Sequence, residues 1–95
     1  MAEKLLTTEI QQKLTELTGW QLTENAIKKQ YVFESFIPAI RFVNRVAEVA
    51  EAADHHPDIT INYRKVTMVL STHSAGGLTR KDFALARQID AAVQG

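Results

Sequence analysis

The sequence contains no cysteine among its 95 residues, and it has only two prolines and four glycines. The absence of cysteine excludes disulfides, thiolate catalysis and zinc sites with sulfur ligands. No apolar run is long enough to span a membrane, and the N-terminal stretch MAEKLLTTEI lacks the apolar centre of a signal peptide. We therefore expect a cytoplasmic protein without a membrane segment.

Neither sign of charge dominates, because eleven lysines and arginines balance eleven aspartates and glutamates. A protein that binds nucleic acid directly needs a clustered basic surface, so we expect no nucleic-acid partner. A net charge of zero does little to prevent self-association, which makes a homodimer or homotetramer plausible. The chain has no repeat, linker or low-complexity tract, and residues 1–95 are interpreted as one domain.

The spacing of apolar residues predicts the first three elements. A helix begins at Thr7 or Thr8, because Thr8 and Gln11 have the spacing of a capping box, and it ends at Gly19. Two short strands follow, joined by a turn at residues 24–25.

A long second helix is predicted from Ser35, a good N-cap residue, to the residues before Pro57. Its apolar residues form two adjacent stripes, one more than a single sheet face requires. Either the core is wide, or part of the helix faces another subunit. The two stripes are Phe36, Ile40, Val43, Ala47 and Ala50, and Phe42, Val46, Val49 and Ala53.

The remaining elements are two strands and a helix. Ile59, Ile61 and Tyr63 alternate as in a third strand, and VTMVLSTH, ending at His73, predicts a fourth. Thr79 and Asp82 again have capping-box spacing, for a helix buried through Phe83, Ala86, Ile89 and Val93. The order αββαββα predicts an α+β fold, a four-stranded antiparallel sheet with three helices on one face.

The sequence has only three histidines, His55, His56 and His73. Histidine is the side chain whose unperturbed pKa suits proton transfer near neutral pH, so the three are candidates for acid–base catalysis. The alternative for the adjacent pair is structural, since imidazolium at the C-terminus of a helix complements its dipole. His73 falls at the end of a strand, on the face opposite the predicted core.

Other chemistries have weaker support. Glu51 or Asp54 could join the histidines around a metal, but adjacent histidines rarely point the same way, and we expect no metal site. No Gly-x-Ser-x-Gly or Walker pattern is present. Asp82 is interpreted as a helix cap unless it also faces a histidine. Trp20 is either a core residue or a platform for a flat heterocycle.

Together these motifs resemble the pterin-4a-carbinolamine dehydratase family. The similarity lies in EAADHHP at residues 51–57, the aromatic Tyr63 and LSTHSAGGLTRKD at residues 70–82. It extends to Gly-Trp at residues 19–20 and to FESF in the second helix, and so covers about Leu14 to Ile89.

The resemblance implies a reaction and a set of residue roles. Family members remove water from a 4a-hydroxy pterin, left by aromatic amino-acid hydroxylases, to give quinonoid dihydropterin, without a metal or organic cofactor. By the family pattern, His55 and His73 are the acid–base residues, and His56 helps to bind the pterin. Glu51 and Asp82 match site carboxylates. The resemblance also implies a pocket wall shaped by Pro57 and by the backbone of Ser71, Thr72, His73 and Ser74.

The chain departs from the family pattern at two places. Many relatives have aromatic residues where this chain has Ile59 and Thr60, and asparagine often occupies the turn at residues 64–65. The resemblance also leaves a second function open. Animal members act as dimerisation cofactors of a homeodomain transcription factor, and some divergent relatives assist enzyme assembly, so a non-enzymatic interaction protein is the alternative.

Overall fold

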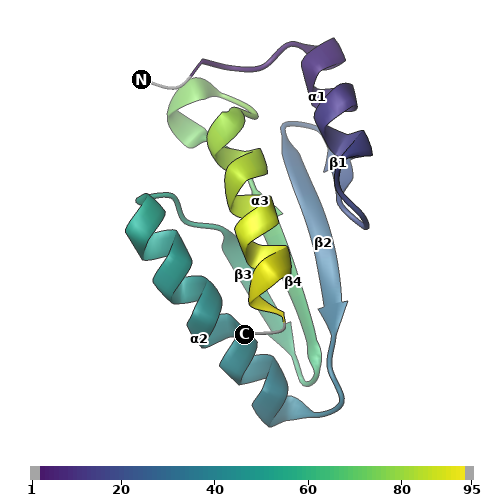
Figure 1. The fold of residues 1–95 in the computed structure, drawn as a ribbon, viewed down its shortest axis with the longest axis vertical. Helices are drawn as coiled ribbons and strands as arrows, with labels where there is room; N and C mark the ends of the chain where they lie inside the picture. Colours follow the sequence, from purple (N-terminus) through teal and green to yellow (C-terminus); the bar gives the residue numbers. More distant parts are fainter. Residues whose placement is uncertain (1–2, 94–95) are drawn as a thin grey trace.

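The computed structural model describes residues 3–93. Three helices and four strands follow one another in the predicted order αββαββα, and a short 3₁₀ turn, η1, precedes the last helix (Figure 1). The elements are α1 (Thr7–Thr15), β1 (Gln21–Thr23), β2 (Ala26–Val32), α2 (Phe36–Ala53), β3 (Asp58–Asn62), β4 (Lys65–Leu70), η1 (His73–Ala75) and α3 (Arg80–Ala92).

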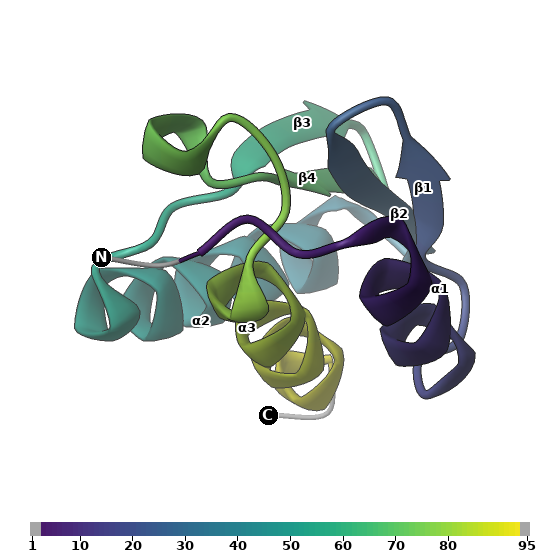
Figure 2. The same ribbon diagram turned by 90° about the horizontal axis from the view of Figure 1, so that it is seen from above.

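The four strands form one antiparallel sheet in the order β1-β2-β4-β3. All three helices lie on one face of this sheet, as predicted (Figure 2). Side chains alternate along β4, where Val66, Met68 and Leu70 are buried against the helices. Thr67 and Val69 point to the opposite, uncovered face and are only half-buried. The fold is therefore a two-layer α+β sandwich with one open sheet face.

The core lies between the sheet and α2 and α3. Phe83, Ala86 and Ile89 of α3 are buried as predicted, but Val93 lies just beyond the helix and is 37% exposed. In α2 the buried residues are Ala39, Phe42, Val46 and Ala50. Phe36, at the first turn of α2, is exposed. The core thus takes only part of the two predicted stripes.

The first helix begins at Thr7, as predicted, but its capping residues and its C-terminal end differ from the prediction. Its N-cap residue is Leu6, whose backbone N–H donates to the Glu9 carboxylate at 3.0 Å, so Thr8 and Gln11 do not form the cap. The helix ends at Thr15, earlier than predicted. Gly19 has a left-handed backbone, with φ of 84°, and lies in the following connection.

The second helix ends at Ala53, earlier than the position directly before Pro57, so the proline is not what ends it. Asp54 stops it by adopting the left-handed conformation, with φ of 51°, and its N–H donates back to carbonyls of the last turn. Aspartate tolerates this conformation better than most residues do. His55 and His56 therefore lie in the connection to β3, already outside the helix.

Both later strands are shorter than predicted. Tyr63 lies outside β3, in the turn to β4, with a left-handed φ of 57°. β4 ends at Leu70, and His73 begins the 3₁₀ turn η1 instead of ending the strand. His73 is exposed, as expected for a histidine outside the core. In the part of the chain that the structure describes, no helix is long and apolar enough to cross a membrane.

Candidate active site

His55 and Asp82 form a largely buried pair between the end of α2 and the start of α3. His55 Nε2 lies 2.6 Å from Asp82 Oδ1. The Asp82 side chain is fully buried and that of His55 is 11% exposed. The two residues are 27 positions apart in the sequence, so only the fold brings them together.

Asp82 is held in place by α3 and by the loop that follows β4. Its Oδ2 accepts hydrogen bonds from the backbone N–H of Thr79 and the hydroxyl of Thr72, both at 2.9 Å. The Thr72 and Thr79 hydroxyl oxygens lie 2.7 Å apart. Thr72, Thr79 and Asp82 are all buried. The predicted capping box of α3 is therefore present, and its carboxylate also faces a histidine.

His56 forms a second pair, at the surface. Its Nε2 lies 2.7 Å from Glu51 Oε1, and the two side chains are 57% and 81% exposed. Glu51 belongs to the last turn of α2, so its partner stands just beyond the end of the helix. The adjacent histidines thus point to different carboxylates, one buried and one solvated.

The other predicted site residues lie next to this arrangement. Pro57 links His56 to β3. His73 and Ser74 are exposed in η1, directly after Thr72, at the same end of the molecule as the end of α2 (Figure 1). Among residues 3–93, His73 joins neither of the histidine–carboxylate pairs. The structure therefore brings His55, Asp82 and Thr72 into contact and leaves the imidazole of His73 accessible.

This arrangement can carry protons but is not built like a metal centre. Across the described range, no group of three or more histidine, cysteine or carboxylate side chains has the placement to hold a metal ion. A histidine oriented by a buried carboxylate is the usual arrangement of a general base or acid. Two imidazoles in different surroundings, one buried and one exposed, could give and take protons on one substrate.

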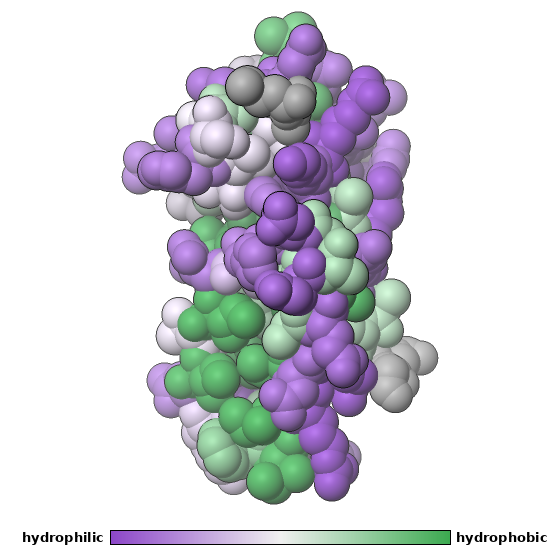
Figure 3. All heavy atoms as spheres, turned by 90° about the vertical axis from the view of Figure 1, so that its left-hand side faces the viewer, coloured by the Kyte–Doolittle hydropathy of each residue, from purple (hydrophilic) through white to green (hydrophobic). Residues whose placement is uncertain are grey.

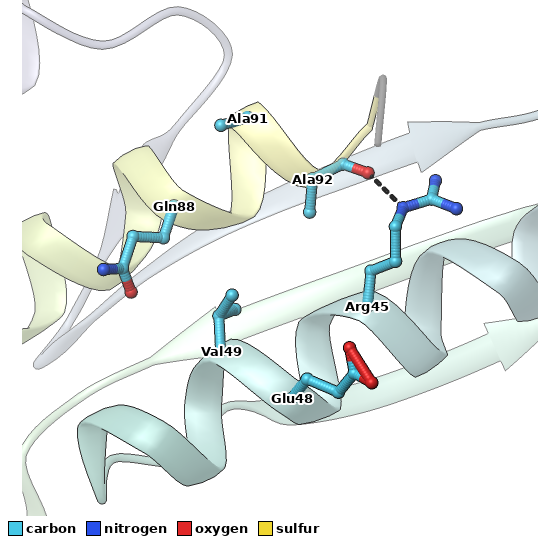
Figure 4. Close-up of a pocket in the computed structure, with 6 residues that line it drawn as sticks. All are labelled: Arg45, Glu48, Val49, Gln88, Ala91 and Ala92. Atoms are coloured by element: carbon cyan, nitrogen blue, oxygen red, sulfur yellow. Dashed lines mark hydrogen bonds between the residues drawn. The ribbon is translucent and has the colours of Figure 1, made fainter.

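A groove between α2 and α3 lies away from the histidines. It has a volume of about 390 Å³. Figure 4 shows Arg45 donating from Nε to the carbonyl of Ala92, so this arginine already caps the end of α3. None of the predicted site residues lines the groove, and we place the candidate site at the histidines. The groove is lined by Arg45, Glu48, Val49, Gln88, Ala91 and Ala92.

Sequence reasoning missed the part that Thr79 plays in the site. The spacing of Thr79 and Asp82 indicated a helix cap, but the contact of the Thr79 hydroxyl with Thr72 depends on how the loop after β4 returns to α3. An isolated antiparallel β-bridge between Thr72 and Gly77 holds the two sides of this loop together. Spacing within a single element could not have predicted a contact across the loop.

A second polar cluster was also missed. Asp90, near the end of α3, accepts hydrogen bonds from Trp20 Nε1, Lys29 Nζ and the Tyr31 hydroxyl. Trp20 is buried, which confirms the core interpretation of this residue. Burial, and to a lesser degree the Asp90 carboxylate, raises the pKa of Tyr31 well above its usual value. Trp20, Lys29 and Tyr31 all donate to this one carboxylate and tie their segments of the chain to α3, so we interpret the cluster as structural.

Comparison with known proteins agrees with the motifs. Residues 3–92 match the family model described as pterin 4 alpha carbinolamine dehydratase. A Picosynechococcus protein is 54% identical over 90 residues, which cover 95% of this chain and 98% of that protein. A Roseiflexus castenholzii protein is 58% identical over 90 residues, covering 95% and 97%. Both carry the name pterin-4-alpha-carbinolamine dehydratase provisionally.

Two solved structures resemble the fold. A transcriptional coactivator/pterin dehydratase from Brucella melitensis has a TM-score of 0.93 and 34% identity, covering 96% of this chain and 99% of that one. A pterin dehydratase-like RuBisCO assembly factor of the alpha-carboxysome has a TM-score of 0.65 and 23% identity, covering 78% and 86%, and shares the fold alone. Since the family model spans nearly the whole chain and close relatives align end to end, this protein belongs to the pterin 4 alpha carbinolamine dehydratase family.

Proposed function

We propose that this protein is a 4a-hydroxytetrahydropterin dehydratase. The observation that carries the proposal is the buried His55–Asp82 pair, in a chain of this family, beside the exposed histidines His56 and His73. The reaction breaks the bond between carbon 4a and its hydroxyl, which leaves as water once protonated. A proton is lost from a ring nitrogen, and the quinonoid dihydropterin results.

The proposed roles of the three histidines are proton transfer and substrate binding. His55 and His73 would exchange protons with the substrate, and each such group typically contributes a factor of about 10² to 10⁴ to the rate. His56, paired with Glu51, would help to hold the pterin. Glu51, Pro57, Thr72, Ser74 and Asp82 would form or support the substrate-binding wall. No metal or organic cofactor takes part in this proposal.

The decisive experiment follows the dehydration of freshly generated 4a-hydroxytetrahydropterin. We expect the wild-type protein to accelerate it well above the spontaneous rate, and His55→Ala and His73→Ala each to lose about 10² to 10⁴ of that acceleration. Circular dichroism checks that both variants are folded. A folded wild-type protein that gives no acceleration would contradict the proposal, and a protein partner would then be sought.

The proposal also includes the setting of the reaction. The substrate would come from an aromatic amino-acid hydroxylase, and the protein would act in the cytoplasm. Both points are testable in the source cells, by locating the protein after fractionation and by measuring pterin recycling when the gene is deleted. Normal pterin recycling in the deletion strain would argue against this role.

We further propose that the protein forms a homo-oligomer through the side that carries α2 and β3. Hydrophobic side chains gather on this side of the molecule (Figure 3). β3 is an edge strand, and it is exposed along its whole length. Ile59 and Ile61 are 37% and 41% exposed on the helix side of the sheet, and Phe36 and Ile37 of α2 are also exposed.

The edge of β3 is suited to a second copy of itself. If two β3 strands paired antiparallel around Thr60, Ile59 of each copy would stand opposite Ile61 of the other. Sedimentation equilibrium should then give a dimer or tetramer, and Ile61→Lys should weaken it. A monomeric wild-type protein at micromolar concentration would refute the proposed oligomer without affecting the proposed reaction.

A further inference from the structure

The hydrogen bonds around Asp82 have directions that can be followed from the backbone. The N–H of Lys81 lies 3.2 Å from Thr79 Oγ1, and the N–H of Thr79 lies 2.9 Å from Asp82 Oδ2. A backbone N–H can only donate. The Thr79 hydroxyl oxygen and the Asp82 carboxylate are therefore both acceptors from the backbone at the start of α3.

The two threonine hydroxyls continue the same direction. Each hydroxyl has a single proton to donate, and an ionised carboxylate has none. The Thr72 hydroxyl, at 2.9 Å from Asp82 Oδ2, must therefore give its proton to the carboxylate. In the 2.7 Å contact between the two hydroxyls, Thr79 is therefore the donor and Thr72 the acceptor. The chain runs from Lys81 through Thr79 and Thr72 to Asp82.

The last step of this chain reaches the histidine. Asp82 Oδ2 already has two donors, while Oδ1 lies 2.6 Å from His55 Nε2. Hydrogen bonds from two donors to a fully buried carboxylate stabilise its ionised form. Because an ionised carboxylate can only accept, the proton between the two groups belongs to His55 Nε2.

We infer that Thr79, Thr72 and Asp82 hold neutral His55 in the tautomer with its proton on Nε2. The other ring nitrogen, Nδ1, is then the atom that accepts a proton when His55 acts as a base and donates it when His55 acts as an acid. This second statement rests on the proposed dehydratase function. Thr72 is a positioning residue in this account, since its hydroxyl acts on His55 through Asp82.

The backbone of Thr72 belongs to the proposed pocket wall, but its side chain has a separate role. The residue is 5% exposed, and its hydroxyl is hydrogen-bonded to Asp82 and Thr79. Thr72→Val keeps the shape of the side chain and removes the hydroxyl. Thr79 then loses its acceptor, and one donor to Asp82 Oδ2 is lost. The carboxylate gains freedom to turn, and the two tautomers of His55 become closer in energy.

The test is a long-range proton–nitrogen correlation spectrum of the whole protein labelled with ¹⁵N-histidine, recorded without substrate at a pH where the ring is neutral. His55→Gln identifies the His55 signals. We expect the Nε2–H pattern in the wild type, a mixed pattern in Thr72→Val, and recovery of the wild-type pattern in Thr72→Ser. The signals of His56 and His73 should stay unchanged in the Thr72 variants.

An Nδ1–H pattern for His55 in the wild type would overturn the assignment. If His55→Gln fails to fold, His56→Gln and His73→Gln, at exposed positions, identify the His55 signals by elimination. An unchanged Nε2–H pattern in folded Thr72→Val would overturn the positioning role. In the dehydration assay, Thr72→Val should lower kcat about tenfold with little change in KM, the scale of one lost hydrogen bond. If the wild type has the expected tautomer but accelerates nothing, the assignment stands and the proposed function fails.

Discussion

Helix α3 carries two aspartates that receive several hydrogen bonds each, one near its start and one near its end. Asp82 is fully buried and faces His55, whereas Asp90 is 28% exposed and binds Trp20, Lys29 and Tyr31. Both link distant parts of the chain to the same helix. They differ in the partner. An imidazole can accept a proton at one ring nitrogen while it donates at the other, whereas the indole, the ammonium and the phenol act here as donors to Asp90.

A carboxylate that accepts several hydrogen bonds is therefore not by itself a sign of catalysis. Asp90 joins the connection before β1, strand β2 and α3, and we interpret its contribution as stability. Asp82 has the same acceptor chemistry, but it orients a group that can exchange protons. The four predictions that follow test this division between an aspartate that orients a histidine and an aspartate that stabilises the fold.

The largest effect is expected from exchanging each carboxylate for an amide. Asp82→Asn should reduce the dehydration rate by about 10³ to 10⁴, the scale seen when a histidine is held in the wrong tautomer. Asp90→Asn, the matched control on the same helix, should keep kcat near the wild-type value. Rates are measured on variants whose fold is verified by circular dichroism. Equal losses of kcat in the two folded variants would remove the distinction.

The stability of the Asp90 cluster is tested by Tyr31→Phe. The change removes a hydroxyl that donates to a carboxylate in a buried setting, and it should lower the free energy of unfolding by about 1.5 to 3 kcal/mol. Urea unfolding followed by circular dichroism measures this, with the midpoint and slope compared to wild type. Dehydration at saturating substrate should be unaffected. A loss of kcat in this variant would mean that the cluster also serves the site.

The same tyrosine predicts how stability depends on pH. Because the pKa of Tyr31 is raised in the folded state, chiefly by burial, unfolding releases a phenol that ionises more readily. Its contribution to stability is complete below about pH 10, where the phenol of the unfolded chain stays protonated, and decreases above it. Urea unfolding across this range should show a steeper fall for wild type than for Tyr31→Phe. Tyr63→Phe is the control for losing a tyrosine, and equal slopes for Tyr31→Phe and wild type would contradict the prediction.

The smallest effect is expected at the solvated pair. Glu51 is 81% exposed, so its attraction to His56 is screened by water and should contribute no more than about 1 kcal/mol. Glu51→Gln should therefore change KM a few-fold, and kcat less. Steady-state kinetics at low and high salt measures both. A loss of kcat as large as that of Asp82→Asn would place Glu51 beside the reacting atoms.

Much of the fold could be predicted from patterns within single elements. The alternation of Val66, Met68 and Leu70 indicated a strand with one buried face, and Thr79 with Asp82 indicated the start of α3. The errors fall at the ends of elements, where one backbone conformation decides the outcome. Asp54 and Tyr63 adopt left-handed conformations that no spacing rule indicated.

The order of elements, the three histidines and the motifs of the family can all be recognised in the amino-acid sequence. The pairing of His55 with Asp82 cannot, because it depends on the folded chain. Side-chain spacing within a helix or strand is set locally, whereas His55 meets Asp82 across 27 positions through the packing of α2 and α3 on one sheet. The hydrogen bonds that run from Thr79 through Thr72 to that carboxylate likewise depend on the folded chain, since they join the loop after β4 to α3.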